Sequence, residues 1–203
     1  LIGAIWGFDG QMIINEGSRS DTIRLFDGEA KSLPFAVACD DFSVSFYENG
    51  MPKEYRSDVT IFDGEKRILS ATIRVNEPLK YRGMKFCQAT YGIAEAHDFK
   101  VFVKDDATGQ EQLLNLALMK KAPLPNGESS FAAARFAPDF QGRGPSLLGV
   151  LLRPEKPHDI FWLSHGESVE HGGYTFSFQD FTARFYTGIQ VGSDPGVPIV
   201  WAG

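Results

Sequence analysis

The four histidines are the side chains of this chain most suited to bind a metal or a haem iron. No two of them are four residues apart and no HExxH motif occurs, so the pattern of a helical zinc site is missing. His165 and His171 lie on either side of a turn region, where a haem or metal contact is conceivable. The alternative, which we prefer for all of them including His97 and His158, is an exposed turn histidine.

The two cysteines, Cys39 and Cys87, are the candidates for redox chemistry. Neither CxxC nor CxxCH occurs, so a thioredoxin-like site, a zinc ribbon and a c-type cytochrome are not supported. Cys39 alternates with Phe35 and Val37, which indicates a buried, inert thiol. A disulfide between the two cysteines is the alternative in an oxidising compartment. We predict that they are not a functional redox pair.

Paired carboxylates occur at Asp40-Asp41 and Asp105-Asp106, a pattern that can serve acid–base catalysis or calcium binding. Their positions, at a strand kink and in a hairpin, favour turn formation instead, because Asp side chains bond to the backbone of turns. The segment 166–170 (GESVE) departs from the nucleophile-elbow pattern at its last position. We therefore predict no catalytic residue and no metal ligand in this chain.

Charge and composition exclude one class of partner and favour one fold class. The net charge of −6 argues against a nucleic-acid surface, since phosphate binding needs clustered Lys and Arg. The basic pair Lys120-Lys121 is interpreted as a solvated loop edge. With 17 Phe and 21 Gly among 203 residues, aromatic side chains and turn formers together favour an all-β fold.

The elements that position these residues are organised around the segment 73–92. Ile73 and Val75 alternate with a polar residue, as in a strand, and Pro78 then interrupts the pattern because it cannot donate to a strand ladder. After Gly83 the alternation resumes at Met84, and we expect the strand to end at Tyr91-Gly92. This pattern predicts a packed corner between two strands.

Two segments share a flip in their apolar alternation, at Asp40-Asp41 and at Gln179-Asp180, which predicts a bulge in each strand. Both continue with the pattern DFxxxFY, in residues 41–47 and 180–186. The interpretation is a two-sheet β-sandwich of bulged antiparallel strands with two equivalent halves, in which Phe42 and Phe181 occupy matching positions in the two sheets. Chance similarity in a Phe-rich chain is the alternative.

Residues 121–145 are the longest stretch without clear periodicity. They are rich in Pro, Gly, Ala and Ser, and a loop, a short helix through residues 130–136 and a mobile flap all remain open.

Residues 1–8 and 197–203 are apolar but too short to span a bilayer, which needs roughly 20 apolar residues. Each run carries a tryptophan, Trp6 or Trp201, of the kind found at membrane interfaces. Buried terminal strands are one interpretation and stumps of flanking membrane helices the other.

Short motifs along nearly the whole chain resemble the large extracytoplasmic domain of the ResB (CcsB) family, whose members are membrane proteins of System II cytochrome c assembly. One departure is Cys87, where the family more often has an aromatic residue. The motifs are Gly3 and Gly7 before Glu16-Gly17, Leu33-Pro34-Phe35, Asp41-Phe42, Phe46-Tyr47, Gly50-x-Pro52-Lys53, Ser57-Asp58, the block Val75–Gly92, Tyr186–Gly192 and Asp194–Ala202.

The resemblance implies a single extracytoplasmic domain over residues 1–203, on the periplasmic or outer face, with residues 1–8 and 197–203 as stumps of transmembrane helices. It implies a membrane partner of the ResC (CcsA) type, with which the family delivers haem and attaches it to apocytochrome c, while separate thiol-disulfide proteins keep the acceptor cysteines reduced. The haem-ligating histidines of the family lie mainly in membrane helices and in the partner, so this chain is expected to hold no cofactor of its own.

Two functions follow as expectations. The first is a non-catalytic docking module that holds the partner subunit and guides apocytochrome c. The second is a ligand-binding β-module with its own hydrophobic pocket for haem or lipid, to which His165 and His171 would belong.

Overall fold

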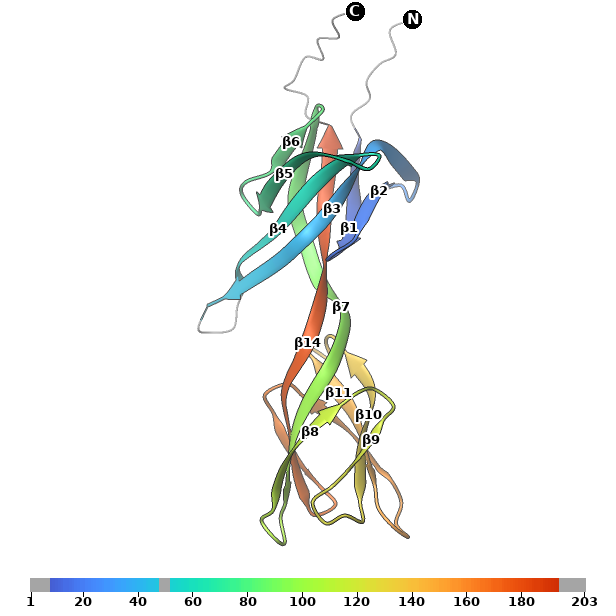
Figure 1. The fold of residues 1–203 in the computed structure, drawn as a ribbon, viewed down its shortest axis with the longest axis vertical. Helices are drawn as coiled ribbons and strands as arrows, with labels where there is room; N and C mark the ends of the chain where they lie inside the picture. The colour runs from blue at the N-terminus through green and yellow to red at the C-terminus, as the bar shows by residue number, and fades with distance from the viewer. Residues whose placement is uncertain (1–7, 48–51, 194–203) are drawn as a thin grey trace, which may run out of the picture. The chain divides into compact units, whose positions relative to one another are not determined.

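The computed structural model describes residues 8–47 and 52–193, and within them the chain is built of strands without a helix (Figure 1). This confirms the predicted all-β class. The strands are β1 (Asp9–Asn15), β2 (Arg19–Leu25), β3 (Ala30–Phe46), β4 (Pro52–Asp63), β5 (Lys66–Arg74), β6 (Leu79–Tyr81), β7 (Met84–Asp105), β8 (Glu111–Leu116), β9 (Lys121–Pro123), β10 (Ser130–Ala137), β11 (Ser146–Leu152), β12 (Asp159–Ser164), β13 (Ser168–His171) and β14 (Tyr174–Ser193).

The strands form two antiparallel sheets, as expected of a sandwich. The ten-stranded sheet has the order β5-β4-β3-β2-β1-β14-β7-β6, with β13 beside β14 and β8 beside β7. The four-stranded sheet has the order β12-β11-β10-β9. Two compact units divide the chain: the first comprises Leu1–Ala94 and Arg184–Gly203, and the second Glu95–Ala183. The expected single domain stays a prediction.

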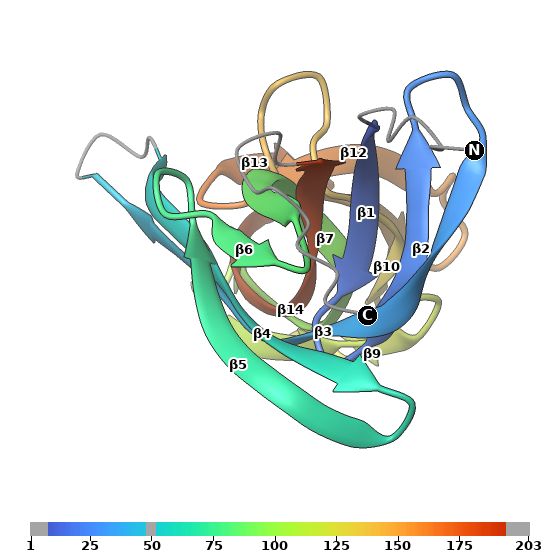
Figure 2. The same ribbon diagram turned by 90° about the horizontal axis from the view of Figure 1, so that it is seen from above.

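In the first unit, one sheet curls around its own core. Phe35 of β3 packs edge-on against Tyr81 of β6, with ring centroids 5.0 Å apart, and also meets Phe86 of β7 at 6.2 Å. In the sheet order, β2, β1 and β14 stand between β3 and β7, so these contacts require a strongly curved sheet. Figure 2 shows β2, β3, β4 and β5 following one another along this curve. Met12, Ile23 and further apolar side chains fill the enclosed core.

The second unit is a sandwich with an aromatic interior. Phe131 of the four-stranded sheet stacks on Phe176 of β14 at 4.7 Å, and Phe136 lies 5.5 Å from Phe99 of β7. Phe99, Phe131 and Phe176 are fully buried. Each such side chain contributes about 1.5–3 kcal/mol through its removal from water, so these rings hold the two layers together.

The corner after β5 forms as predicted. Arg82 and Gly83, between β6 and β7, have φ angles of 48° and 71°, as a two-residue type I′ hairpin turn requires. The expected strand end at Tyr91-Gly92 is wrong, because β7 continues to Asp105. A Cβ on Gly92 would lie 2.6 Å from the ring of Tyr186, so this glycine makes room for a ring and does not turn the chain.

The bulge predicted at Asp40-Asp41 is confirmed, since the pairing of β3 with β4 shifts between Cys39 and Asp41. The extra residue lets both Cys39 and Phe42 face the core, where both are buried. The placement of Phe42 and Phe181 in two different sheets is wrong. Both lie in the ten-stranded sheet, on β3 and β14 respectively, and they belong to different units.

The short helix considered for residues 130–136 is also wrong, because Ser130–Ala137 forms β10. Alanine-rich composition suits a helix, but pairing with β11 and the burial of Phe131 and Ala133 on one face select a strand. The segments with Trp6 and Trp201, expected as membrane stumps, lie outside the described residues.

Candidate functional site

The two histidines considered as haem ligands, His165 and His171, contact different side chains. Nε2 of His165 lies 3.1 Å from the backbone oxygen of Gln179, and its ring meets Phe178 and Phe181 edge-on at 5.4 and 5.6 Å. His171, on β13, instead stacks flat on Phe161 at 4.0 Å. Their strand partners on β14 are Phe178 and Tyr174, which at about 3.3 Å per residue are roughly 13 Å apart. The structure does not bring the two rings into one site, and their haem role stays a prediction.

The two cysteines are free thiols in different surroundings. Cys39 is fully buried on β3, whereas Cys87 is half-buried on β7. Burial raises the pKa of the Cys39 thiol to about 12, and the nearby carboxylates of Glu16, Asp40 and Asp41 act in the same direction. A thiol with such a pKa is a poor nucleophile at neutral pH, which agrees with the expected inert role.

The paired carboxylates form turns and bulges, as predicted. Oδ1 of Asp105 accepts hydrogen bonds from the backbone N–H groups of Ala107 and Thr108, which closes the turn after β7. Asp40, at the bulge of β3, accepts a hydrogen bond from the hydroxyl of Thr60. Across residues 8–47 and 52–193, no three His, Cys, Asp or Glu side chains gather as a metal site would require.

A buried polar cluster, not predicted from the sequence, joins three strands of the first unit. The side chains of Ser57, Gln88 and Thr187 lie on β4, β7 and β14 and are 0%, 5% and 0% exposed. The Ser57 hydroxyl is 2.6 Å from Oε1 of Gln88 and 2.8 Å from Oγ1 of Thr187, and Nε2 of Gln88 donates to that same Oγ1 at 2.8 Å. The cluster ties β4 to β7 and β14 across the core, because a shift of β4 would break both hydrogen bonds of the buried Ser57 hydroxyl.

The sequence does contain a signal for this cluster. Ser57 shares strand parity with Val59 and Ile61, Gln88 with Phe86, and Thr187 with Ile189, so each polar residue stands where its strand faces inward. All three also belong to motifs that carry the family resemblance. A polar residue at an inward position indicates a partner across the core, but the partner itself cannot be read from one sequence.

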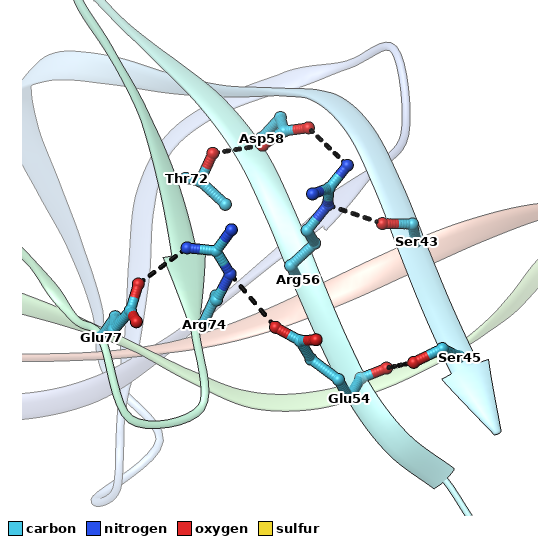
Figure 3. Close-up of polar contacts among 8 residues, drawn as sticks. All are labelled: Ser43, Ser45, Glu54, Arg56, Asp58, Thr72, Arg74 and Glu77. Carbon is cyan, nitrogen blue, oxygen red and sulfur yellow. Dashed lines mark hydrogen bonds and ion pairs between the residues drawn. The ribbon is translucent and has the colours of Figure 1, made fainter. Parts of the chain in front are cut away.

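A charged ladder lies on the outward side of β3, β4 and β5, the side that faces away from the core of the first unit (Figure 3). Arg74 of β5 binds Glu54 of β4 at 3.1 Å and Glu77 at 2.7 Å. The hydrogen bond to Glu77 raises the pKa of the Arg74 guanidinium. Arg56 of β4 stands opposite Arg74 in the strand pairing, so these two pairs also relieve a repulsion between like charges.

The other charged groups of the ladder, Arg56 and Asp58, also have partners within the sheet. Nε of Arg56 donates to Ser43 of β3 at 2.9 Å, and its guanidinium lies 3.9 Å from Asp58, which accepts a 2.5 Å hydrogen bond from Thr72 (Figure 3). A shallow groove of about 190 Å³ runs along Ser43, Ser45, Glu54 and Arg56. Because both guanidinium groups already have carboxylate partners, the ladder is suited to face water and not to capture an anion.

The first and last described strands are neighbours. β1 pairs with β14 along its whole length, and Asp9 stands opposite Gly192. The backbone hydrogen bond from Ser193 to Phe8 extends this pairing. The chain therefore starts β1 and leaves β14 at the same end of the same sheet.

The described residues form an all-β module. Comparison with known proteins identifies its relatives: the ResB-like family model matches residues 1–166, so the chain belongs to the ResB-like family. It is 27% identical over 95% of its length to the cytochrome c biogenesis protein Ccs1 of Rhodomonas salina, of which it covers 42%. It is 28% identical over its full length to the cytochrome c biogenesis protein CcsB of Thermosynechococcus vestitus, of which it covers 46%.

The chain thus spans a little under half the length of the curated relatives it matches. In the described part of the chain, no helix has the length and apolar character needed to cross a bilayer.

Proposed function

We propose that this chain is the extracytoplasmic β-module of a membrane-anchored protein of cytochrome c assembly. In this role it is a non-catalytic docking element that acts with a membrane partner of the ResC (CcsA) type while haem is delivered and attached to apocytochrome c. The observation that carries the proposal is the family match over residues 1–166, together with relatives that are named as cytochrome c biogenesis proteins.

The strand order supports the membrane-anchored part of this proposal. A module held between two membrane segments must receive and return the chain on one side. The pairing of Asp9 with Gly192 meets this requirement within the described residues. The extracytoplasmic side, the haem and the partner come from the family resemblance.

The proposal is tested in the full-length protein, in a host that depends on it for cytochrome c assembly. Residues 10–191 are replaced by a short Gly/Ser linker, which the adjacency of Asp9 and Gly192 allows without strain on the flanking segments. We expect loss of holocytochrome c, measured by haem staining, at an unchanged level of the anchored protein. A Leu113→Ala variant, altered at an exposed position of β8, is the control. Normal holocytochrome c in the linker variant would refute the proposal.

Haem titration of chain 1–203 separates the docking role from the haem-pocket alternative. The docking role predicts no sharp Soret shift, and unchanged titrations for His165→Ala and His171→Ala. Tight binding that is lost on either substitution would favour the pocket instead.

A further inference from the structure

The outward face of the four-stranded sheet is apolar, unlike the outward face of β3, β4 and β5, which carries the charged ladder. Its residues follow from the strand pairing: Leu148 stands opposite Trp162, and Val150 opposite Ile160. Leu147, Leu151 and Phe161, which alternate with them, are buried in the sandwich interior, so these side chains point the other way. We call the outward set the apolar face, and its members are Leu148, Val150, Leu152, Ile160 and Trp162.

The apolar face is open to solvent along its β12 edge. Ile160 is 64% exposed, and it lies near the start of this edge strand, where it is paired with Val150 of β11. Trp162 is half-buried because Phe140, from the turn after β10, stacks on its ring at 4.0 Å. An outward sheet face normally carries polar residues, and a contiguous apolar patch on a sheet marks an interaction surface.

Two cations flank the apolar face on the side of β9 and β10. Lys121 pairs with Ala132, which pairs with Val150, and Arg135 pairs with Leu148, so both cations share the outward direction. Both are exposed, and among the described residues neither has an ion pair or a side-chain hydrogen bond. The arginines of the ladder, by contrast, are paired with carboxylates. These two cations are therefore available to pair with carboxylates on a partner.

We propose that the apolar face binds a protein partner whose contact surface is apolar at its centre and carries carboxylates opposite Lys121 and Arg135. The proposal names the surface behind the docking role and so rests on the proposed function. Ile160, which is exposed, and Trp162, which is large and aromatic, are the main apolar contacts, since a few large side chains carry most of the binding energy of an interface. The two cations orient the partner and speed its association.

Charge argues against a second copy as the occupant. A second copy of this chain would set its own Lys121 and Arg135 against the same face, and none of the outward strand residues of that face is a carboxylate. An anionic membrane would meet these cations and Lys156, but also the exposed carboxylates of Glu128 and Glu155 in the turns after β9 and β11, so lipid is kept as an outcome that the experiment separates.

The experiment uses the full-length protein in cells that make c-type cytochromes, with a photo-crosslinking amino acid at Ile160. Leu113, 51% exposed on β8, is the matched control position. We expect a crosslink from position 160 to a second protein, absent from position 113 and lost with Arg135→Glu. Crosslinks to another copy, to another part of the same polypeptide or to lipid, or no crosslink, would overturn the proposal.

A functional measurement accompanies the crosslink. Ile160→Asp is expected to weaken partner binding about tenfold and to lower holocytochrome c, whereas Leu113→Asp leaves both unchanged. Thermal unfolding of both variants checks the fold, and Ile160→Ser replaces Ile160→Asp if the latter unfolds. Normal assembly in the folded Ile160 variant, combined with loss in the linker variant, overturns the docking surface alone. Normal assembly in the linker variant overturns the proposed function.

Discussion

The two units differ in their interiors and in one outward face each. The first unit has a hydrogen-bonded polar cluster inside, at Ser57, Gln88 and Thr187, and a charged ladder outside. The second unit has stacked phenylalanines inside, with a smaller buried hydroxyl pair at Ser146 and Ser164, and an apolar face on its four-stranded sheet. Both are antiparallel sheet structures, so the fold does not dictate this difference. A surface whose charges are paired within its own sheet is suited to face water, whereas the apolar face beside unpaired cations is the surface that we propose binds a partner.

The largest expected effect comes from the aromatic interior. Phe176→Ala removes the ring that contacts Phe131 and Phe161 from the other sheet, and we expect about 3–5 kcal/mol of lost stability. The measurement is denaturant unfolding of chain 1–203. Leu113→Ala, on an exposed face, should stay within about 0.5 kcal/mol of the wild type. An equal, small effect for both variants would show that the sandwich interior is not tightly packed.

The polar interior of the first unit should be less costly to break. Gln88→Leu leaves the hydroxyls of Ser57 and Thr187 with fewer partners in a buried site, and we expect a loss of about 2 kcal/mol. Gln190→Leu, at an exposed position of β14, controls for the change of residue type. A variant as stable as the wild type would mean that the cluster does not hold the curled sheet.

Cys39 gives the first unit a stability that depends on pH. Its pKa is about 12 in the folded chain, above the value of about 8.5 for an unfolded cysteine, so folding favours the protonated thiol. This contribution is fully present below about pH 8.5 and is lost as the pH rises toward 12. We expect the unfolding free energy of the wild type to fall more steeply from pH 8.5 to pH 11 than that of Cys39→Ala. Parallel curves would contradict the prediction.

The smallest effect is expected at the ladder. Arg74→Gln removes ion pairs to Glu54 and Glu77 that are partly exposed, and such pairs are worth at most about 1 kcal/mol. The difference from the wild type should shrink further in high salt, because screening weakens exposed pairs. The control is Arg24→Gln, another exposed arginine of the same unit. A loss of several kcal/mol would mean that the ladder is a structural element and not a solvent-facing surface.

Local sequence signals predicted a good part of this fold. The kink at Asp40-Asp41 was visible because an extra residue must break the alternation of period two, and the corner at Pro78 and Gly83 because these residues restrict the backbone. The end of β7 was predicted wrongly because a glycine can either end a strand or leave space for a neighbouring ring. At Gly92 the ring of Tyr186 occupies that space, and this contact is not visible in the sequence. The sequence of residues 130–137 does not reveal a strand, since its pairing with β11 is a tertiary contact.

The candidate surfaces were harder to predict for the same reason. The alternation within β12 shows that Ile160 and Trp162 share one side of the strand and that Phe161 points to the other. The apolar row across the sheet appears only when β10, β11 and β12 are aligned. His165 and His171 were candidates because imidazole can bind a metal or a haem iron. In the structure their rings pack against Phe161, Phe178 and Phe181.

The pairing of Asp9 with Gly192 has a mechanical consequence. Opposed Cα atoms in an antiparallel pair are only about 4.5–5.5 Å apart, so everything from β1 to β14 can be inserted as a cassette at the tip of a hairpin in an unrelated host protein. The same geometry sets how the chain would respond to tension on its ends. A pull that separates Asp9 from Gly192 would unzip β1 from β14 one residue pair after another, so the molecule would yield at low force where a sheared pair of strands would resist.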